Sequence, residues 1–288
     1  DASWHHLVGV AVLSLLSACE SSVDGLAPQP MVTPTFVGSE SCQSCHAEEF
    51  DAWLGSHHAL AMQYATTDTV LGDFSGVDLE HFGVVSSFSE RDGSFYVRTD
   101  SADGEMQEFL ISYTFGVMPL QQYLVEFPQG RLQVLPIAWD SRPSDEGGQR
   151  WFHLYPDQSI EYTDSLHWTG REQNWNFMCA ECHSTNLQKN YSATNNSFNT
   201  TWSEINIGCE GCHGPGSGHV EQAEGGHFTS TAGLLVDLDD TGRAVWEMNA
   251  QTGIASRSEV RLRSPSEPEA CGRCHSRRSG ITESYQYN

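Results

Sequence analysis

Eight of the nine cysteines lie in four copies of one pattern, two cysteines separated by two residues and followed directly by a histidine. This C-x-x-C-H pattern is typical of covalent c-type haem attachment. Two sulfurs three residues apart can form thioethers to the two vinyl groups on one porphyrin edge, and the next imidazole can reach the iron. We therefore predict four covalently bound c-type haems. The attaching residues are Cys42, Cys45, Cys179, Cys182, Cys209, Cys212, Cys271 and Cys274, and the proximal iron ligands are His46, His183, His213 and His275.

Two other interpretations of the cysteines are possible. Two C-x-x-C pairs thirty residues apart, beginning at Cys179 and Cys209, could form a four-cysteine zinc site, and eight cysteines could form four disulfides in an exported protein. Neither explains why a histidine follows every pair. With 13 histidines in 288 residues, the chance of that coincidence is roughly four in a million if positions are independent. The pattern therefore favours haem.

A haem iron with two histidine ligands needs a distal imidazole as well as the proximal one. We predict His58, His219 and His167 as distal ligands. His58 follows the first motif on what we expect to be one continuing helix. His219 follows the third motif after a glycine- and proline-rich stretch that interrupts a helix and lets the backbone approach a porphyrin face. His167 lies in an aromatic-rich segment before the second motif.

For each of these three, the alternative is a histidine hydrogen-bonded on the surface or in the core. His153 lies between two apolar residues and equally suits a core imidazole. We do not expect His81 or His227 to bind iron, and His57 cannot share an iron with its neighbour.

The N-terminal residues resemble a bacterial lipoprotein signal. A ten-residue apolar run, Leu7 to Leu16, is too short to span a bilayer but suits a signal peptide, and it leads into Leu16-Ser17-Ala18-Cys19, which resembles a lipobox. We predict an incomplete lipoprotein signal peptide at residues 1–18, and a lipid anchor at Cys19 with a tether over residues 19–37. The alternative is a core helix with a chance cysteine. Haem thioethers form outside the cytoplasm, so we expect an exported, periplasm-facing or outer-membrane lipoprotein; Glu20 favours the outer membrane.

The charge limits the possible partners. The chain has 38 acidic and 14 basic side chains, a formal net charge of −24. This excess argues against nucleic-acid binding, because phosphates must be met by clustered Lys and Arg. We expect redox partner proteins, other cytochromes or a quinol-linked complex, that dock through basic or neutral surfaces, together with the membrane through the lipid anchor.

The expected fold is that of a multihaem cytochrome c, with short helices and loops packed around haems and an inserted antiparallel β-rich segment, an α+β fold with little regular secondary structure. We predict one tetrahaem domain at residues 38–288, with helices and loops at 39–64, 171–220 and 265–280 and the β-rich insert at about 80–140. Asp92-Gly93 signals a hairpin within the insert. A second hairpin is expected between 234–238 and 244–248.

Five segments carry a resemblance to a known family: Tyr113 to Tyr123, Ala138 to Pro143, Asn174 to Thr185, Cys209 to Ser217 and Cys271 to Arg278. Over residues 38 to 285 the chain resembles bacterial multihaem c-type cytochromes of the cytochrome c-552/4-like type. The chain resembles especially the subgroup in which tetratricopeptide repeats follow the haem region. The resemblance implies covalent haem, irons with mostly two histidine ligands, and electron transfer. It supports His58 and His219 as distal ligands, and it implies a further motif and repeats beyond Asn288.

The leading functional hypothesis is electron transfer by a lipid-anchored, exported tetrahaem cytochrome. The alternative is a multihaem oxidoreductase acting on a small nitrogen or sulfur compound at one haem with an open coordination position. A third option is a haem-bearing sensor or scaffold. All four motifs end in histidine, and no cluster of acid, base and nucleophile is apparent, so the sequence favours a carrier over an enzyme.

Overall fold

The computed structural model describes residues 33–227, 233–236, 238, 246–257 and 266–276. The chain divides by its contacts into Asp1–Thr33 and Pro34–Asn288, and the description below concerns the second unit. The predicted signal peptide and the lipid anchor at Cys19 lie outside the described residues.

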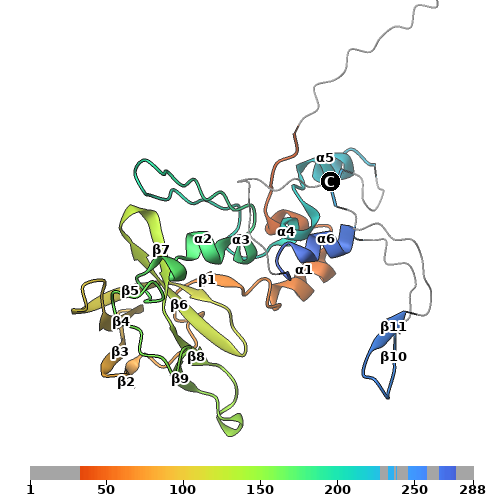
Figure 1. The fold of residues 1–288 in the computed structure, drawn as a ribbon. Coiled ribbons are helices and arrows are strands. Elements are labelled where there is room, and N and C mark those ends of the chain that lie inside the picture. The colour runs from red at the N-terminus through yellow and green to blue at the C-terminus, as the bar shows by residue number, and fades with distance from the viewer. Residues whose placement is uncertain (1–32, 228–232, 237, 239–245, 258–265, 277–288) are drawn as a thin grey trace, which may run out of the picture. The chain divides into compact units, whose positions relative to one another are not determined.

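The largest element is an antiparallel sheet (Figure 1). Its main order is β2-β3-β4-β5-β6-β8-β9, with β1 paired to β5 and β7 paired to β6. The predicted antiparallel β-rich segment is confirmed, because β2 to β6 pair consecutively and antiparallel. Strands begin before residue 80 and continue past residue 140, so the sheet extends beyond the expected insert at both ends. The strands are β1 Met62–Tyr64, β2 Ser75–His81, β3 Val84–Arg91, β4 Ser94–Asp100, β5 Met106–Phe115, β6 Leu120–Phe127, β7 Arg131–Val134, β8 Ile137–Asp140 and β9 Arg150–His153.

The predicted hairpin at Asp92-Gly93 joins β3 to β4. Asp92 has φ 51° and Gly93 has φ 75°, so both central residues of this two-residue turn have positive φ. Such turns match the right-handed twist of the flanking strands, and Asp and Gly tolerate the backbone they require.

The sheet buries side chains on two sides. One core is rich in aromatic residues, and within it the ring of Phe88 stacks on Trp151 with centroids 3.8 Å apart. Tyr123 belongs to this core, and its hydroxyl donates to Gln121 at 2.8 Å and accepts from the Gly72 amide at 2.9 Å. The next residue on β6, Leu124, packs into a second core, as expected from the alternation of side chains along a strand.

The second core joins the sheet to a haem-attachment motif. Met62, Leu132 and Trp175 are buried in it, and Cys179 of the second C-x-x-C-H motif packs against it. The sheet therefore has a core of its own on one side and supports the second motif on the other.

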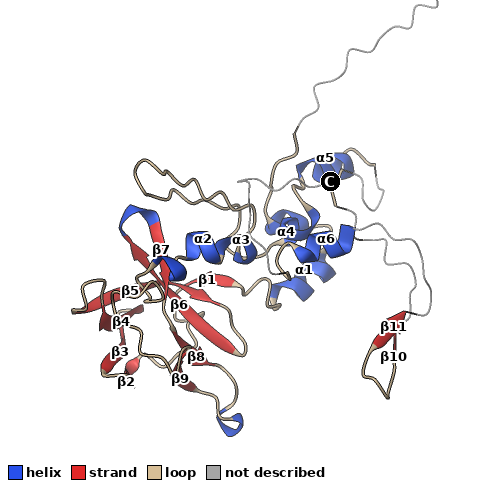
Figure 2. Cartoon of the chain, viewed as in Figure 1, coloured by secondary structure: helices blue, strands red, loops and turns tan. Residues whose placement is uncertain are grey.

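The helices are short (Figure 2). The α-helices all begin in the stretches predicted to carry haem, whereas η2 and η3 lie among the strands. α1 ends at Leu54, so the prediction that its helix continues to His58 is wrong; Gly55 follows the helix, and His58 lies in the turns beyond it. The helices are η1 Ser39–Cys42, α1 Ala47–Leu54, η2 Pro128–Gly130, η3 Ser144–Glu146, η4 Arg171–Gln173, α2 Trp175–Met178, α3 Ala180–His183, α4 Cys209–His213, α5 Ser217–Glu224 and α6 Ser266–Gly272.

The second predicted hairpin is paired differently. β10 (Trp246–Met248) pairs with β11 (Ala255–Arg257), and residues 234–236 form no strand. The turn lies after β10, where the Asn249 side chain accepts hydrogen bonds from two backbone amides at 3.0 Å and Gly253 adopts φ 68°. Asn and Gly are strong turn formers, and both lie in this turn.

Among the residues that the structure describes, no helix is long and apolar enough to cross a bilayer.

Candidate haem sites

Each C-x-x-C-H motif folds as about one helical turn. In the first motif the His46 amide donates to the Cys42 carbonyl at 2.9 Å, and in the fourth the His275 amide donates to the Cys271 carbonyl at 2.8 Å. Residues three and four apart lie on one face of such a turn. The two sulfurs and the imidazole of a motif can therefore address the same ligand.

The motifs also contact one another. Cys42 of the first motif lies beside Cys209 of the third, and this neighbour raises the pKa of Cys42. In the fourth motif, Arg273 donates through Nη1 to the Gly211 carbonyl of the third at 3.0 Å, and its own carbonyl accepts a long contact from Cys182 Sγ of the second at 3.8 Å. Among the described residues none of the motif cysteines forms a disulfide. These contacts connect the motifs in the order first, third, fourth, second.

Two pairs of histidine rings have the spacing of axial iron ligands. His46 of the first motif and His219 have ring centroids 6.1 Å apart, and so do His58 and His275 of the fourth motif. A metal-bound imidazole nitrogen lies about 2 Å from the metal and its ring centre about 1 Å further, so two axial rings have centroids about 6 Å apart. The structure thus brings both His58 and His219 to a motif histidine. His58 lies opposite the fourth motif, not the first.

The other two motif histidines are packed inside the protein. Burial lowers the pKa of both His183 and His213, which keeps the imidazoles neutral, as a metal ligand must be. Their Nδ1 atoms are buried and have no hydrogen-bond partner among the described residues. The ring of His183 lies 4.3 Å from that of Phe115. Each ring also has a backbone hydrogen bond, His183 with Ala61 and His213 with Val236. The described part of the chain thus leaves Nδ1 of each ring without a partner, which fits residues that hold a prosthetic group.

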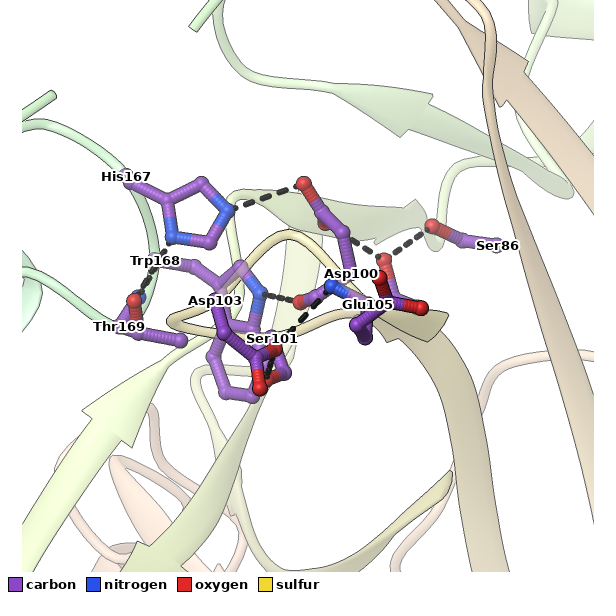
Figure 3. Close-up of polar contacts among 9 residues, drawn as sticks. Ser86, Asp100, Ser101, Asp103, Glu105, His167, Trp168 and Thr169 are labelled. Atoms are coloured by element: carbon purple, nitrogen blue, oxygen red, sulfur yellow. Dashed lines mark hydrogen bonds and ion pairs between the residues drawn. The ribbon is translucent and has the colours of Figure 1, made fainter. Parts of the chain in front are cut away.

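The structure does not bring His167 to a motif. Its side chain is buried, with 3% of the residue exposed, and Figure 3 shows both ring nitrogens facing polar partners. Nε2 lies 3.1 Å from Asp100 Oδ2 and Nδ1 lies 2.8 Å from Thr169 Oγ1. Trp168 Nε1 donates to the Asp100 carbonyl at 2.7 Å. His167 therefore has the role of a core histidine that ties the loop before the second motif to β4.

Two further histidines, the last residues of β2 and β9, stack on each other. The rings of His81 and His153 are nearly parallel with centroids 3.6 Å apart. His153 Nδ1 accepts from the Tyr155 amide at 3.1 Å, and burial together with neighbouring His81 lowers the pKa of His153 to about 4. His57 and His227 are exposed.

Two acidic residues near the third motif, Glu204 and Glu210, were not predicted from the sequence. Glu210, between the cysteines of the third motif, is only 2% exposed, and Glu204 precedes that motif by a few residues. A glutamate between the cysteines of a motif is a weak signal for Glu210, because Glu181 also lies between the cysteines of the second motif, and nothing in the pattern points to Glu204.

Comparison with known families supports the class indicated by the motifs. Residues 41–75 and 148–214 match the profile of the family described as "Cytochrome c554 and c-prime". The two segments contain the first three C-x-x-C-H motifs, and the gap between them holds most of the sheet. With its four attachment motifs, the chain is a multihaem c-type cytochrome.

Two solved structures show similarity. A structure described as outer cell wall cytochrome OcwA is 20% identical with a TM-score of 0.43, over 71% of this chain and 35% of that chain. An undecaheme cytochrome from the S-layer of Carboxydothermus ferrireducens is 21% identical with a TM-score of 0.37, over 66% of this chain and 22% of that chain. The matched region thus spans about a third of the first protein and less of the second. No curated protein matches the chain.

Proposed function

We propose that this cytochrome is an electron carrier with four covalent haems that relay single electrons. The observation that carries the proposal is the placement of His46 against His219 and of His58 against His275, each with ring centroids 6.1 Å apart. A bound c-type haem supplies an iron that changes between the ferric and ferrous states. Imidazoles on both sides of an iron leave no position for a substrate, so these pairs favour transfer over catalysis.

The residues divide into attaching and ligating groups. The eight motif cysteines hold the porphyrins, and the motif histidines supply the proximal ligands. His219 supplies the distal ligand at the first motif and His58 at the fourth. His167 is left out of this set because both of its ring nitrogens have partners within the protein.

The contacts between motifs support a relay. The Cys42–Cys209 contact, the bond from Arg273 to Gly211 and the contact from Cys182 to Arg273 keep each motif next to another. Haems held at neighbouring motifs would exchange electrons in this spatial order, rather than in the order of the sequence.

A second function has one observation in its favour. Among the described residues, no histidine ring pairs with His183 or His213 at the spacing seen for the other two motifs. A haem there with an open position would suit an oxidoreductase acting on a small nitrogen or sulfur compound.

We further propose that the protein is exported and lipid-anchored. The support is chemical: thioether attachment occurs outside the cytoplasm, and Leu16-Ser17-Ala18-Cys19 fits a lipobox. Partners would be other cytochromes or a quinol-linked complex, docking against a chain of net charge −24 through neutral or basic surfaces. A Cys19→Ala variant should be released from the membrane fraction, and continued retention would contradict the anchor.

Two measurements test the function. The mass of the purified holoprotein should exceed that of the polypeptide by four haems, and a zinc-loaded, haem-free protein would refute the proposal. Low-temperature electron paramagnetic resonance (EPR) of the oxidised protein should then show low-spin ferric signals from the irons of the first and fourth motifs. A high-spin signal that shifts on adding nitrite or hydroxylamine would favour the oxidoreductase instead.

A further inference from the structure

The carboxylate of Glu210 is buried and receives its hydrogen bonds from backbone amides. The Val37 amide donates to both of its oxygens at 2.9 and 3.0 Å, the Gly38 amide to Oε2 at 2.8 Å, and the Gly216 amide to Oε1 at 2.7 Å. Among the described residues no Lys, Arg or His pairs with it. A buried carboxylate is costly unless it is fully hydrogen-bonded, and Glu210 meets that condition entirely through the main chain.

The amides that Glu210 binds belong to two distant segments. Val37 and Gly38 lead directly into η1 and the first motif, which ends at His46. Gly216 leads directly into α5, which carries His219. A single side chain of the third motif therefore holds the lead-in to both imidazoles of the His46–His219 pair.

Neighbouring contacts strengthen the same junction. The Thr35 amide donates to Ser217 Oγ at 2.8 Å, and the Ser217 amide donates to the Thr35 carbonyl at 3.1 Å, so the two lead-in segments also pair with each other. Gly216 has no side chain, and a Cβ there would come within 3.2 Å of Glu210 Oε1. This glycine allows the backbone its close approach to the carboxylate.

Glu204 makes a second link between the first and third motifs. It accepts from the Ser39 amide at 3.2 Å and from Ser39 Oγ at 2.9 Å, and that hydroxyl accepts in turn from the Cys209 amide at 2.9 Å. Ser39 is 1% exposed. Glu204 fixes only the segment of the first motif, whereas Glu210 holds both segments.

We propose that Glu210 is a positioning residue for the first haem, although it belongs to the motif of the third. It sets the spacing between His46 and His219 by holding both of their lead-in segments. Its buried negative charge also favours the ferric over the ferrous state of irons nearby, because opposite charges attract more strongly in a medium of low polarity. This inference rests on the proposed haem ligation.

The test is a Glu210→Gln variant of the holoprotein, which keeps the shape and removes the charge. A glutamine amide accepts hydrogen bonds through one oxygen only. Its NH₂ group must therefore face the amide N–H groups of Val37 and Gly38 in one orientation, or those of Val37 and Gly216 in the other. We expect one low-spin EPR signal to shift or to convert to high spin, and one midpoint potential to rise. Unchanged signals and potentials, even with reduced thermal stability, would overturn the proposal. The matched control is Glu221→Gln, which removes an exposed charge from α5 and should change neither.

Two companion variants keep the outcome unambiguous. If His219→Ala leaves the EPR spectrum unchanged, the proposed ligation itself is wrong; if His219→Ala changes it and Glu210→Gln does not, only the role of Glu210 is refuted. If Glu210→Gln fails to load haem, Glu210→Asp decides, because it keeps the charge on a shorter side chain. We then expect a changed EPR signal with a smaller rise in potential, and a wild-type spectrum would overturn the proposal.

Discussion

The imidazole rings of His46 and His219 lie with their centroids 6.1 Å apart, although the entire sheet separates them in the sequence. The spacing is that of two ligands on opposite sides of one iron. Because α5 carries His219 and the first motif carries His46, segments from before and after the sheet in the sequence would share one iron.

Removing His219 should affect one haem and leave the others unchanged. In His219→Ala the iron at the first motif loses its distal ligand, so about one iron in four should become high-spin in the EPR spectrum. The haem count by mass spectrometry should stay at four, because the cysteines are intact. His227→Ala is the matched control, since His227 is exposed and follows the same helix. Equal spectra for the two variants would contradict the pairing.

The His58–His275 pair makes a separable prediction. His58→Ala should convert a different iron to high spin, and adding imidazole to the solution should restore the low-spin signal by replacing the missing side chain. The adjacent His57→Ala is the control, because that exposed ring has no place in either pair. If His57→Ala gives the same spectrum as His58→Ala, the assignment of His58 as the ligand opposite His275 is wrong.

Gly208 should be intolerant of a side chain. It precedes α4, and a Cβ there would come within 2.0 Å of Glu204 Oε2 and 2.5 Å of Ser39 Oγ, two atoms held by their own hydrogen bonds. Gly208→Ala should therefore lower stability by about 1–3 kcal/mol, typical of overpacking, and thermal unfolding measures the loss. Gly272→Ala in the fourth motif is the control, since a Cβ there meets nothing within 4 Å. If both variants lose the same free energy of unfolding, the contacts around Gly208 add no cost and the prediction is wrong.

Local patterns in the sequence predict the attachment motifs and the sheet. Four C-x-x-C-H motifs give the proposed haem-binding residues, and Asp92-Gly93 between alternating strands predicts the β3–β4 hairpin. Both signals depend on residues a few positions apart, so they can be recognised without knowledge of the tertiary structure.

Contacts between distant segments could not be predicted in this way. The sequence places His58 next to the first motif, yet its ring faces His275 of the fourth. Glu210 is one of the two positions that the C-x-x-C-H pattern leaves unspecified. Its amide partners come from a segment before the sheet strands in the sequence and from a segment after them. His167 resembles a free ligand until the fold brings Asp100 of β4 to its ring. In each case the deciding partner is remote in the sequence.

The Asp100–His167 pair should contribute stability and no iron ligand. Burial raises the pKa of Asp100, but hydrogen bonds from His167 and Thr99 outweigh it and hold the pKa below its usual value. A folded-state pKa below the unfolded value of about 3.9 means that the contribution is complete above roughly pH 4 and is lost as the pH falls further. Asp100→Asn should therefore cost about 1–3 kcal/mol of unfolding free energy at pH 7, and its difference from the wild type should shrink below pH 4. Asp78→Asn, an exposed change on β2, is the control. Urea unfolding between pH 7 and pH 3 measures the difference in unfolding free energy, and a difference that does not change with pH would refute the role of the Asp100 charge.

His167→Ala should lower stability as well, because it removes the partner of Asp100. Its low-spin EPR signals should match those of the wild type, and a new high-spin signal would instead identify His167 as a haem ligand.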